Sequence, residues 1–215
     1  MIHLIILDFD GTLGDTRANI VLTMRQTQER LGYPLASEDE IAATIGLPLE
    51  EGFRQLLPGL SDDKTLECAL TYRGIFEVNR KKLVPKLFPN VKKTLSSLRG
   101  KGYVLTVASS RMSKSLNGFL TDMGISEYIT YVLGADNVTK AKPDPEPVLK
   151  TMSDLGFSPE ETLVVGDMPV DILMGKSAGA LTCGVTYGNS SREDLVASGA
   201  DYVVDDFSAV LSVLN

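Results

Sequence analysis

Short runs of consecutive apolar residues alternate with longer amphipathic segments over most of this chain. The first run, Leu4-Ile5-Ile6-Leu7, has no polar alternation, which is typical of a strand buried on both faces of a parallel sheet. From residue 90 onward the pattern predicts helices over 91–99, 114–123, 146–155, 170–178 and 192–197, which alternate with strands over 103–107, 131–133, 162–165, 181–185 and 202–204. This alternation predicts an α/β fold with a doubly wound, Rossmann-like parallel sheet.

Residues 16–85 have a different pattern, in which no convincing strand occurs. Helical spacing of apolar residues predicts a helix over 16–31, and Ser37-Glu38-Asp39-Glu40 has the form of a capping box. Pro48 and Ser61 are expected to begin two further helices that end near residues 57 and 83. We therefore expect an all-helical domain at residues 16–85, inserted into a sheet domain made of residues 1–15 and 86–215.

The composition excludes several functional classes. The 21 Lys and Arg residues against 28 Asp and Glu give a net charge of −7 without a basic stripe, so neither nucleic acid nor an anionic membrane is an expected partner. His3 is the single histidine, which argues against His-centred acid–base chemistry. Cys68 and Cys183 lack metal-ligand spacing, and no signal peptide or membrane-spanning stretch is apparent. We expect a cytoplasmic protein.

Two acidic residues follow the first predicted strand, in the segment Asp8-Phe9-Asp10-Gly11-Thr12-Leu13. Two carboxylates about 4 Å apart repel each other by roughly 4 kcal/mol at an effective dielectric constant of about 20. A chain keeps such a pair where a cation or a reacting anion requires it. The alternative is an ordinary acidic turn made by Asp-Gly.

Polar residues also follow the next three predicted strands. They are Ser109, Ser110 and Arg111 after the second strand, Lys142 in the loop after the third, and Asp167 and Asp171 after the fourth. Each has a simple structural explanation as a polar strand end, a solvated charge or a helix cap. However, ligands of open α/β sheets bind beyond the carboxyl ends of the strands. We therefore expect these side chains to converge on one site.

The order of these segments resembles that of the haloacid dehalogenase-like superfamily, in the subfamily with a helical cap after the first strand. The resemblance spans essentially the whole chain and includes Lys142-Pro143-Asp144-Pro145 and Gly166-Asp167-x-x-x-Asp171. The stretch Ile45-Gly46-Leu47-Pro48-Leu49 looks like that of phosphoglycolate phosphatases and their close relatives. β-Phosphoglucomutases share the cap type and all four motifs, which are the segments that contain Asp8, Ser109, Lys142 and Asp167.

This resemblance implies phosphoryl transfer through an aspartyl phosphate, with Asp8 as the nucleophile. Asp10 would protonate the leaving oxygen and then deprotonate the hydrolytic water. Lys142 would neutralise charge on Asp8, and Ser109 would donate a hydrogen bond to a phosphoryl oxygen. The presence of Asp10 argues against carbon–halogen cleavage, because dehalogenases resemble this chain at the nucleophile but lack the second aspartate.

A Mg²⁺ ion is the implied cofactor. By resemblance, it would be held by Asp8, Asp167 and the backbone carbonyl of Asp10, with Asp171 in support directly or through water. Magnesium suits a site whose available ligands are all hard oxygens.

The motifs indicate the substrate much less specifically than they indicate the superfamily. Gly11, Ser110, Arg111 and Arg54 are the substrate-binding candidates, although Arg54 is equally well explained as a solvated surface residue. A small phosphorylated metabolite, foremost a small phosphorylated acid, is expected. A sugar phosphate, a nucleoside monophosphate, pyrophosphate, a phosphosugar mutase activity and a non-catalytic phospho-ligand-binding protein remain alternatives. We expect a monomer or a weak homodimer.

Overall fold

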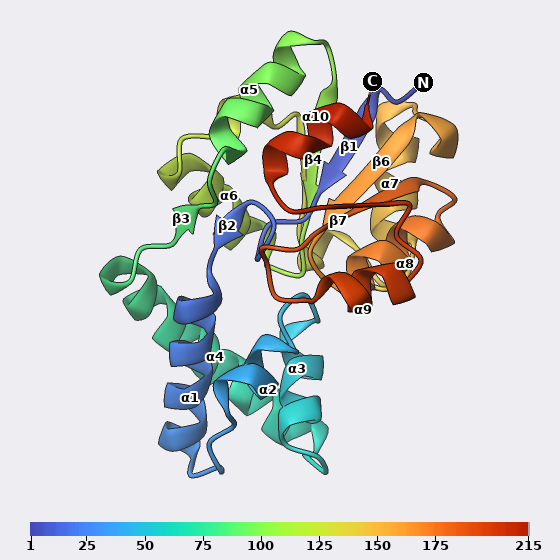
Figure 1. Cartoon of the computed structure of the whole chain (residues 1–215). Helices are drawn as coiled ribbons and strands as arrows, with labels where there is room; N and C mark the ends of the chain where they lie inside the picture. Colours follow the sequence, from blue (N-terminus) through green and yellow to red (C-terminus); the bar gives the residue numbers. More distant parts are fainter. Residues whose placement is uncertain (215) are drawn as a thin grey trace.

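A six-stranded parallel sheet lies at the centre of the computed structural model, which describes residues 1–214 (Figure 1). Its strand order is β5-β4-β1-β6-β7-β8, and every neighbouring pair is parallel. The strands are β1 (Leu4–Leu7), β4 (Val104–Ala108), β5 (Tyr131–Leu133), β6 (Thr162–Gly166), β7 (Leu181–Val185) and β8 (Tyr202–Val204). The predicted doubly wound sheet is confirmed. Because the strand order reverses at β1, its carboxyl end lies at the switch point where such sheets bind ligands.

Helices cover both faces of this sheet. They are α5 (Val91–Gly100), α6 (Ser113–Asp122), α7 (Glu146–Leu155), α8 (Pro169–Ser177), α9 (Arg192–Ala197) and α10 (Val210–Val213), with short 3₁₀ turns η1 (Ser126–Tyr128), η2 (Ala135–Asn137), η3 (Pro159–Glu161) and η4 (Phe207–Ala209). Parallel strands can be joined only by a crossover connection, which is usually a helix, and this explains why helices separate successive strands of the sheet.

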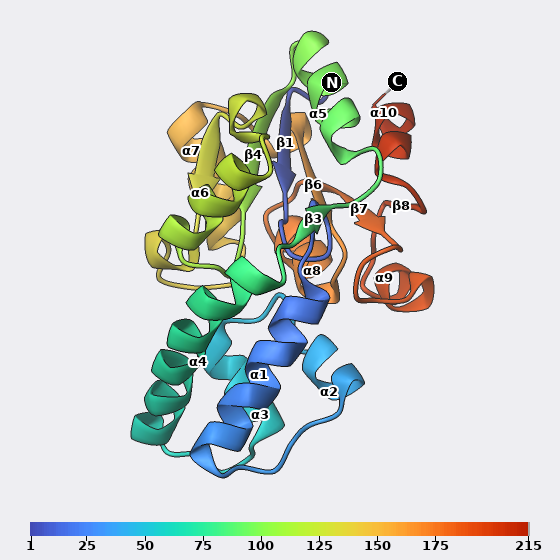
Figure 2. The ribbon, with the colours of Figure 1, turned by 90° about the vertical axis from the view of Figure 1, so that its left-hand side faces the viewer.

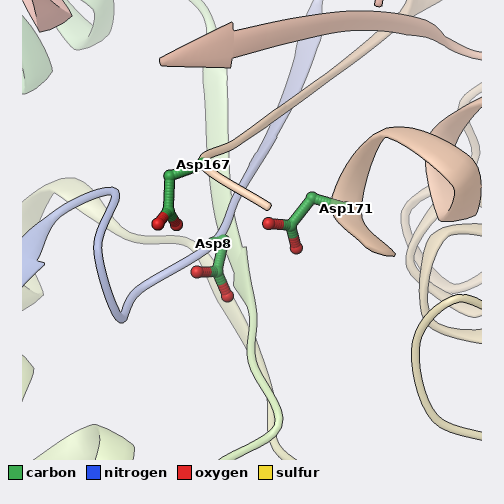
Figure 3. Close-up of side chains that lie close together, drawn as sticks. All are labelled: Asp8, Asp167 and Asp171. Atoms are coloured by element: carbon green, nitrogen blue, oxygen red, sulfur yellow. The ribbon is translucent and has the colours of Figure 1, made fainter. Parts of the chain in front are cut away.

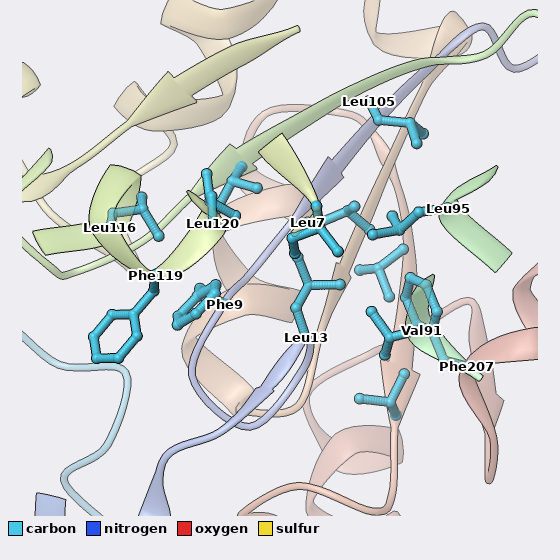
Figure 4. Close-up of a cluster of buried hydrophobic side chains, with 14 of the residues drawn as sticks. Leu7, Phe9, Leu13, Val91, Leu95, Leu105, Leu116, Phe119, Leu120 and Phe207 are labelled. Carbon is cyan, nitrogen blue, oxygen red and sulfur yellow. The ribbon is translucent and has the colours of Figure 1, made fainter. Parts of the chain in front are cut away.

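The alternation of side chains along β1 divides the core into two layers. Ile5 and Leu7 belong to the cluster that includes α5 and α6, whereas Leu4 and Ile6 belong to the cluster that includes α7 and α8. Figure 4 shows the first cluster around Leu7. All four residues of β1 are fully buried, which accounts for the uninterrupted apolar run in the sequence. Asp8 therefore directly follows a strand that is packed on both faces.

Four helices without a strand form the insert, which we call the cap. They are α1 (Arg17–Leu31), α2 (Glu38–Ala42), α3 (Leu49–Leu56) and α4 (Asp62–Lys82). The predicted capping box at Ser37 is confirmed, because its hydroxyl accepts from the Glu40 amide and its own amide donates to the Glu40 carboxylate. The cap lies beyond the carboxyl end of β1 (Figures 1 and 2). No helix among residues 1–214 is both long and apolar enough to span a bilayer.

Both connections between the cap and the sheet domain pass through one small feature that the sequence pattern does not reveal. Strand β2 (Gly14–Asp15) pairs antiparallel with β3 (Lys86–Leu87). Figure 1 shows these two strands between the cap helices and the sheet. The domain boundaries expected near residues 15 and 86 coincide with this pair, and the division into two domains stays a prediction.

Candidate active site

Three buried carboxylates meet at the carboxyl end of β1 (Figure 3). Asp8 follows β1, Asp167 follows β6, and Asp171 lies in the first turn of α8. One oxygen from each lies within 4.8 Å of the other two, and the three residues are no more than 4% exposed. Adjacent parallel strands bring the first two together, because β1 pairs with β6 in register from Leu4 to Leu7.

Lys142 is the cation of this cluster. Its ammonium Nζ lies 2.5 Å from Asp8 Oδ1 and 2.7 Å from Asp171 Oδ1, and its side chain is 2% exposed. Burial alone would lower the pKa of Lys142, but Asp171 and Asp8 outweigh burial and raise this pKa, so the residue is fully charged. With all three carboxylates ionised, the four side chains carry a net charge of −2.

Asp167 is held by donors that the sequence analysis did not single out. Its Oδ1 accepts from the Thr12 hydroxyl at 3.0 Å, and its Oδ2 accepts from the backbone and side-chain amides of Asn189 at 2.8 and 2.9 Å. Gly11 has φ +91°, and a Cβ there would lie 2.2 Å from Asp167 Oδ2. Glycine is therefore required at residue 11 by both its backbone conformation and the closeness of this carboxylate.

The pKa values of Asp8 and Asp167 are raised because both carboxylates are buried close to other carboxylates. Burial raises the pKa of Asp8 well above its ordinary range, although Lys142 opposes the shift. Burial and, next, Asp171 raise the pKa of Asp167 to about 7. Groups perturbed by burial together with specific charged neighbours are typical of functional sites.

The cluster fits a hard divalent cation. All its donors are oxygens, and Asp8 Oδ2 is buried without a hydrogen-bond partner among the described residues. An orphaned carboxylate oxygen of this kind costs free energy unless a ligand occupies it. The net charge of −2 also matches a divalent ion. The side chain of Asp10 is not part of this cluster, so its expected contribution through the backbone carbonyl stays a prediction.

The carboxylate of Asp10 instead pairs with Arg111. The guanidinium Nε donates to Oδ1 and Oδ2 at 2.9 and 2.7 Å, and Nη2 donates to Oδ1 at 2.7 Å. The hydroxyl of Thr16, the residue before α1, also donates to Oδ1 at 2.5 Å. Burial alone would lower the pKa of Arg111, but Asp10 outweighs burial and raises it. The expected acid–base residue is thus held by charge-assisted hydrogen bonds.

The two serines after β4 have different environments. Ser109 lines a small cavity together with Lys142, and its hydroxyl accepts from the Arg111 amide at 3.2 Å. Ser110 donates from its hydroxyl to the carbonyl of Gly46 in the cap at 2.5 Å. The structure therefore places Ser109 beside the charged cluster, whereas Ser110 links the sheet domain to the cap.

A larger cavity of about 750 Å³ lies between the cap and the sheet domain. Asp10, Ser110 and Arg111 line it from the sheet domain. Arg54 does not line it. The Arg54 guanidinium lies 2.9 Å from Asp62 on the cap surface and is 42% exposed, so the structure does not bring this candidate to the site. This position agrees with the alternative that Arg54 is a solvated surface residue.

Comparison with known proteins gives a consistent result. Residues 5–185 match the family model described as haloacid dehalogenase-like hydrolase. The chain is 38% identical to "Probable phosphatase IndB" of Dickeya dadantii, over 99% of this chain and 93% of that protein. It is 33% identical to the pyrophosphatase PpaX of Anoxybacillus flavithermus, over 100% of this chain and 97% of that protein. A crystal structure described as a predicted phosphoglycolate phosphatase from Haemophilus somnus superposes with a TM-score of 0.87 at 28% identity. The match covers 100% of this chain and 98% of that chain.

Proposed function

Because the chain belongs to the haloacid dehalogenase-like hydrolase family, we propose that it is a Mg²⁺-dependent phosphatase of a small phosphorylated metabolite, acting through an aspartyl phosphate. One observation carries this proposal. The Asp8 carboxylate has one oxygen paired with Lys142 and the other buried without a partner, at the carboxyl end of the central strand. This arrangement supports a nucleophile whose free oxygen meets a ligand.

In the first half-reaction, an Asp8 oxygen forms a bond to phosphorus while the bond from phosphorus to the ester oxygen breaks. Asp10 gives its proton to the departing oxygen. In the second half-reaction, a water oxygen attacks the same phosphorus and gives a proton to Asp10. The bond between phosphorus and Asp8 then breaks and inorganic phosphate leaves. Asp10 thus regains the proton that it gave to the departing oxygen.

Electrostatic stabilisation comes from the side chains around Asp8. Lys142 offsets the negative charge that builds up between Asp8 and the phosphoryl group, and Ser109 donates a hydrogen bond to a phosphoryl oxygen. Asp8 and Asp167 would hold Mg²⁺, with Asp171 in support. When bound, this ion offsets the repulsion between the carboxylate and the phosphate dianion.

The cap supplies the walls for the leaving group. Asp10 and Arg111 line the cavity between the cap and the sheet domain, so a leaving group bound there would lie beside the acid–base residue. A cap that covers the site also excludes bulk water from a hydrolysable acyl phosphate. The cytoplasmic location, the absence of a polymer or membrane partner, and a monomeric or weakly dimeric state stay predictions.

Phosphate release from a panel of metabolites, with and without Mg²⁺, tests the proposal. The panel contains phosphoglycolate, sugar phosphates, nucleotides, pyrophosphate and a generic aryl phosphate. We expect Mg²⁺-dependent release in the wild type and its loss in a folded Asp8→Asn variant. Retained ligand binding without turnover would contradict the enzyme assignment. Isomerisation of a sugar phosphate that needs a bisphosphate primer would instead indicate a mutase.

A further inference from the structure

The Arg111 guanidinium, which pairs with Asp10, contacts two aromatic rings, one from the cap and one from α6. The guanidinium carbon lies 4.8 Å from the ring centroid of Phe76 in α4 of the cap and 4.8 Å from that of Phe119 in α6. The side chains of Arg111 and Asp10 are 11% and 10% exposed. The two rings also contact each other edge to face, with centroids 6.0 Å apart, so they lie on adjacent sides of the guanidinium. Their contacts limit the freedom of the guanidinium, so it loses little freedom on binding a planar anion. Asp10 now occupies that anion-binding edge.

The cavity beside this pair exceeds the needs of a very small leaving group. Its volume of about 750 Å³ lies in the range of sites for drug-sized ligands. The cap side of its wall is largely apolar, with Ile20, Met24 and Tyr72 among its residues. A leaving group as small as glycolate would leave most of this apolar wall without contact.

Three other cationic side chains line the cavity. Lys114 of α6 is exposed to solvent, and the two arginines of the cap already have anionic partners. Arg73 pairs with Glu50 at 2.7 Å, and Arg80 lies 3.5 Å from Glu77. Neither partner is needed for the chemistry at Asp8, so no catalytic event requires these pairs to open. The pair between Arg111 and Asp10 is different, because Asp10 is the residue that must serve the leaving oxygen.

We propose that Arg111 is a specificity-determining residue that exchanges Asp10 for an oxyanion at the far end of the leaving group. This inference rests on the proposed phosphatase function and names its substrate class: phosphomonoesters whose leaving group has an apolar body and a carboxylate or a second phosphate. A carboxylate or phosphate presents the same paired oxygens to the guanidinium as Asp10 does. The anionic substrate therefore releases Asp10 without leaving Arg111 unpaired.

A neutral leaving group offers no such replacement. Its binding either leaves Asp10 held by Arg111 or opens a buried ion pair without compensation, which is strongly unfavourable. The exchange therefore favours substrates with an anionic leaving group, because only these compensate Arg111 when it releases Asp10. Selection by this route depends on the charge of the leaving group and not on its shape.

Two aryl phosphates of nearly the same shape separate charge from shape. In 3-carboxyphenyl phosphate the leaving group is anionic, and in 3-carbamoylphenyl phosphate it is neutral. Benzene-1,3-diyl bisphosphate adds the arm in which the anion is a phosphate. The ratio of kcat/KM between the anionic and neutral substrates is measured with saturating Mg²⁺ for wild type, Arg111→Met, Arg111→Lys and the control Arg99→Met, an exposed arginine outside the cavity.

We expect the wild type to prefer an anionic substrate by about tenfold or more, equivalent to about 1.4 kcal/mol or more. The preference should persist in Arg99→Met, fall below about twofold in Arg111→Met, and be partly retained in Arg111→Lys, which keeps a positive charge beside the rings. A merely structural role would lower both rates together and leave the ratio unchanged. An unchanged ratio of kcat/KM in either Arg111 variant would overturn the proposed exchange. The exchange would also be overturned if Arg111→Lys lost the preference for anionic substrates as completely as Arg111→Met.

The two proposals fail in different ways. Hydrolysis of all the substrates by the wild type without a preference for anionic ones would overturn the role of Arg111 and leave the phosphatase function intact. The absence of Mg²⁺-dependent hydrolysis of any phosphoester would overturn the phosphatase function itself, and with it the exchange. A preference for the bisphosphate alone would assign the anion site to phosphate, and a preference for the carboxylate alone would assign it to carboxylate.

Discussion

Replacing Asp167 with asparagine is expected to stabilise the metal-free protein while abolishing its activity. The side chain of Asp167 is one of three carboxylates with oxygens within 4.8 Å of one another. At that distance one pair of unit charges repels by about 3.5 kcal/mol at an effective dielectric constant of about 20. An amide at residue 167 keeps the existing contacts, because its oxygen accepts from Asn189 and its nitrogen donates to the Thr12 hydroxyl.

The raised pKa of Asp167 gives an independent magnitude and the sign of the pH dependence. A shift from 3.8 to about 7 means that ionisation in the folded protein costs about 4 kcal/mol more than in the unfolded chain. Because the folded state holds the proton more tightly, this group favours folding at low pH. Its contribution is lost as pH rises from about 4 through about 7. The advantage of Asp167→Asn is therefore largest near pH 8 and falls to less than half at pH 5.

Thermal unfolding in EDTA measures this effect directly. At pH 8 the variant should unfold several degrees above the wild type, since each kcal/mol shifts the midpoint by about 2–4 °C in a chain of this size. Saturating Mg²⁺ should raise the wild-type midpoint and leave that of the variant almost unchanged, because the variant lacks a metal ligand. Asp201→Asn is the control, since Asp201 accepts from Lys176 and Thr182 and its removal should not stabilise the protein. An Asp167→Asn variant less stable than the wild type at pH 8 in EDTA would refute the reasoning.

Three further substitutions test separate parts of the site. Asp10→Asn should lower kcat by about 10²-fold or more and lead to an accumulated phosphoenzyme visible by mass spectrometry, and normal turnover would remove its acid–base role. Lys142→Met leaves Asp8 and Asp171 without their cation, so the free energy of unfolding in denaturant should fall by about 3–5 kcal/mol together with activity, and an unchanged denaturation midpoint would contradict the electrostatic account. Arg54→Ala should change kcat/KM by less than about twofold, because the guanidinium pairs with Asp62 outside the cavity. A large loss confined to anionic substrates would instead support the expected substrate-binding role of Arg54.

The convergence of the charged residues could be predicted because it depends on topology alone. Asp8, Asp167 and Lys142 each follow a predicted strand, and the carboxyl ends of parallel strands lie at one edge of the sheet. The uninterrupted apolar run before Asp8 identified the central strand for the same reason, since a strand buried on both faces cannot alternate. These features need only the order and type of elements, which the hydrophobic pattern determines.

Side-chain partnerships were not predictable, because they depend on how domains and loops pack. Helical spacing placed Arg54 on a helix, but the orientation of that helix depends on tertiary contacts such as the hydrogen bond from Ser110 to Gly46. The pair between Arg111 and Asp10 joins residues 101 positions apart. Asn189 lies in a loop after β7 and belongs to no motif that the pattern could indicate. The two-residue strands β2 and β3 are too short to show any periodicity.

The pairing of β2 with β3 has a consequence for how such a protein diversifies. The chain leaves the sheet domain through Gly14–Asp15 and returns through Lys86–Leu87, and these two segments are hydrogen-bonded neighbours. Neighbouring strands lie about 4.8 Å apart, so a turn of a few residues would be long enough to replace the whole intervening lid. A lid with a different fold could therefore be joined to the sheet domain at the same two chain positions. Substrate range would then evolve by exchange of a module, while the reaction is inherited unchanged.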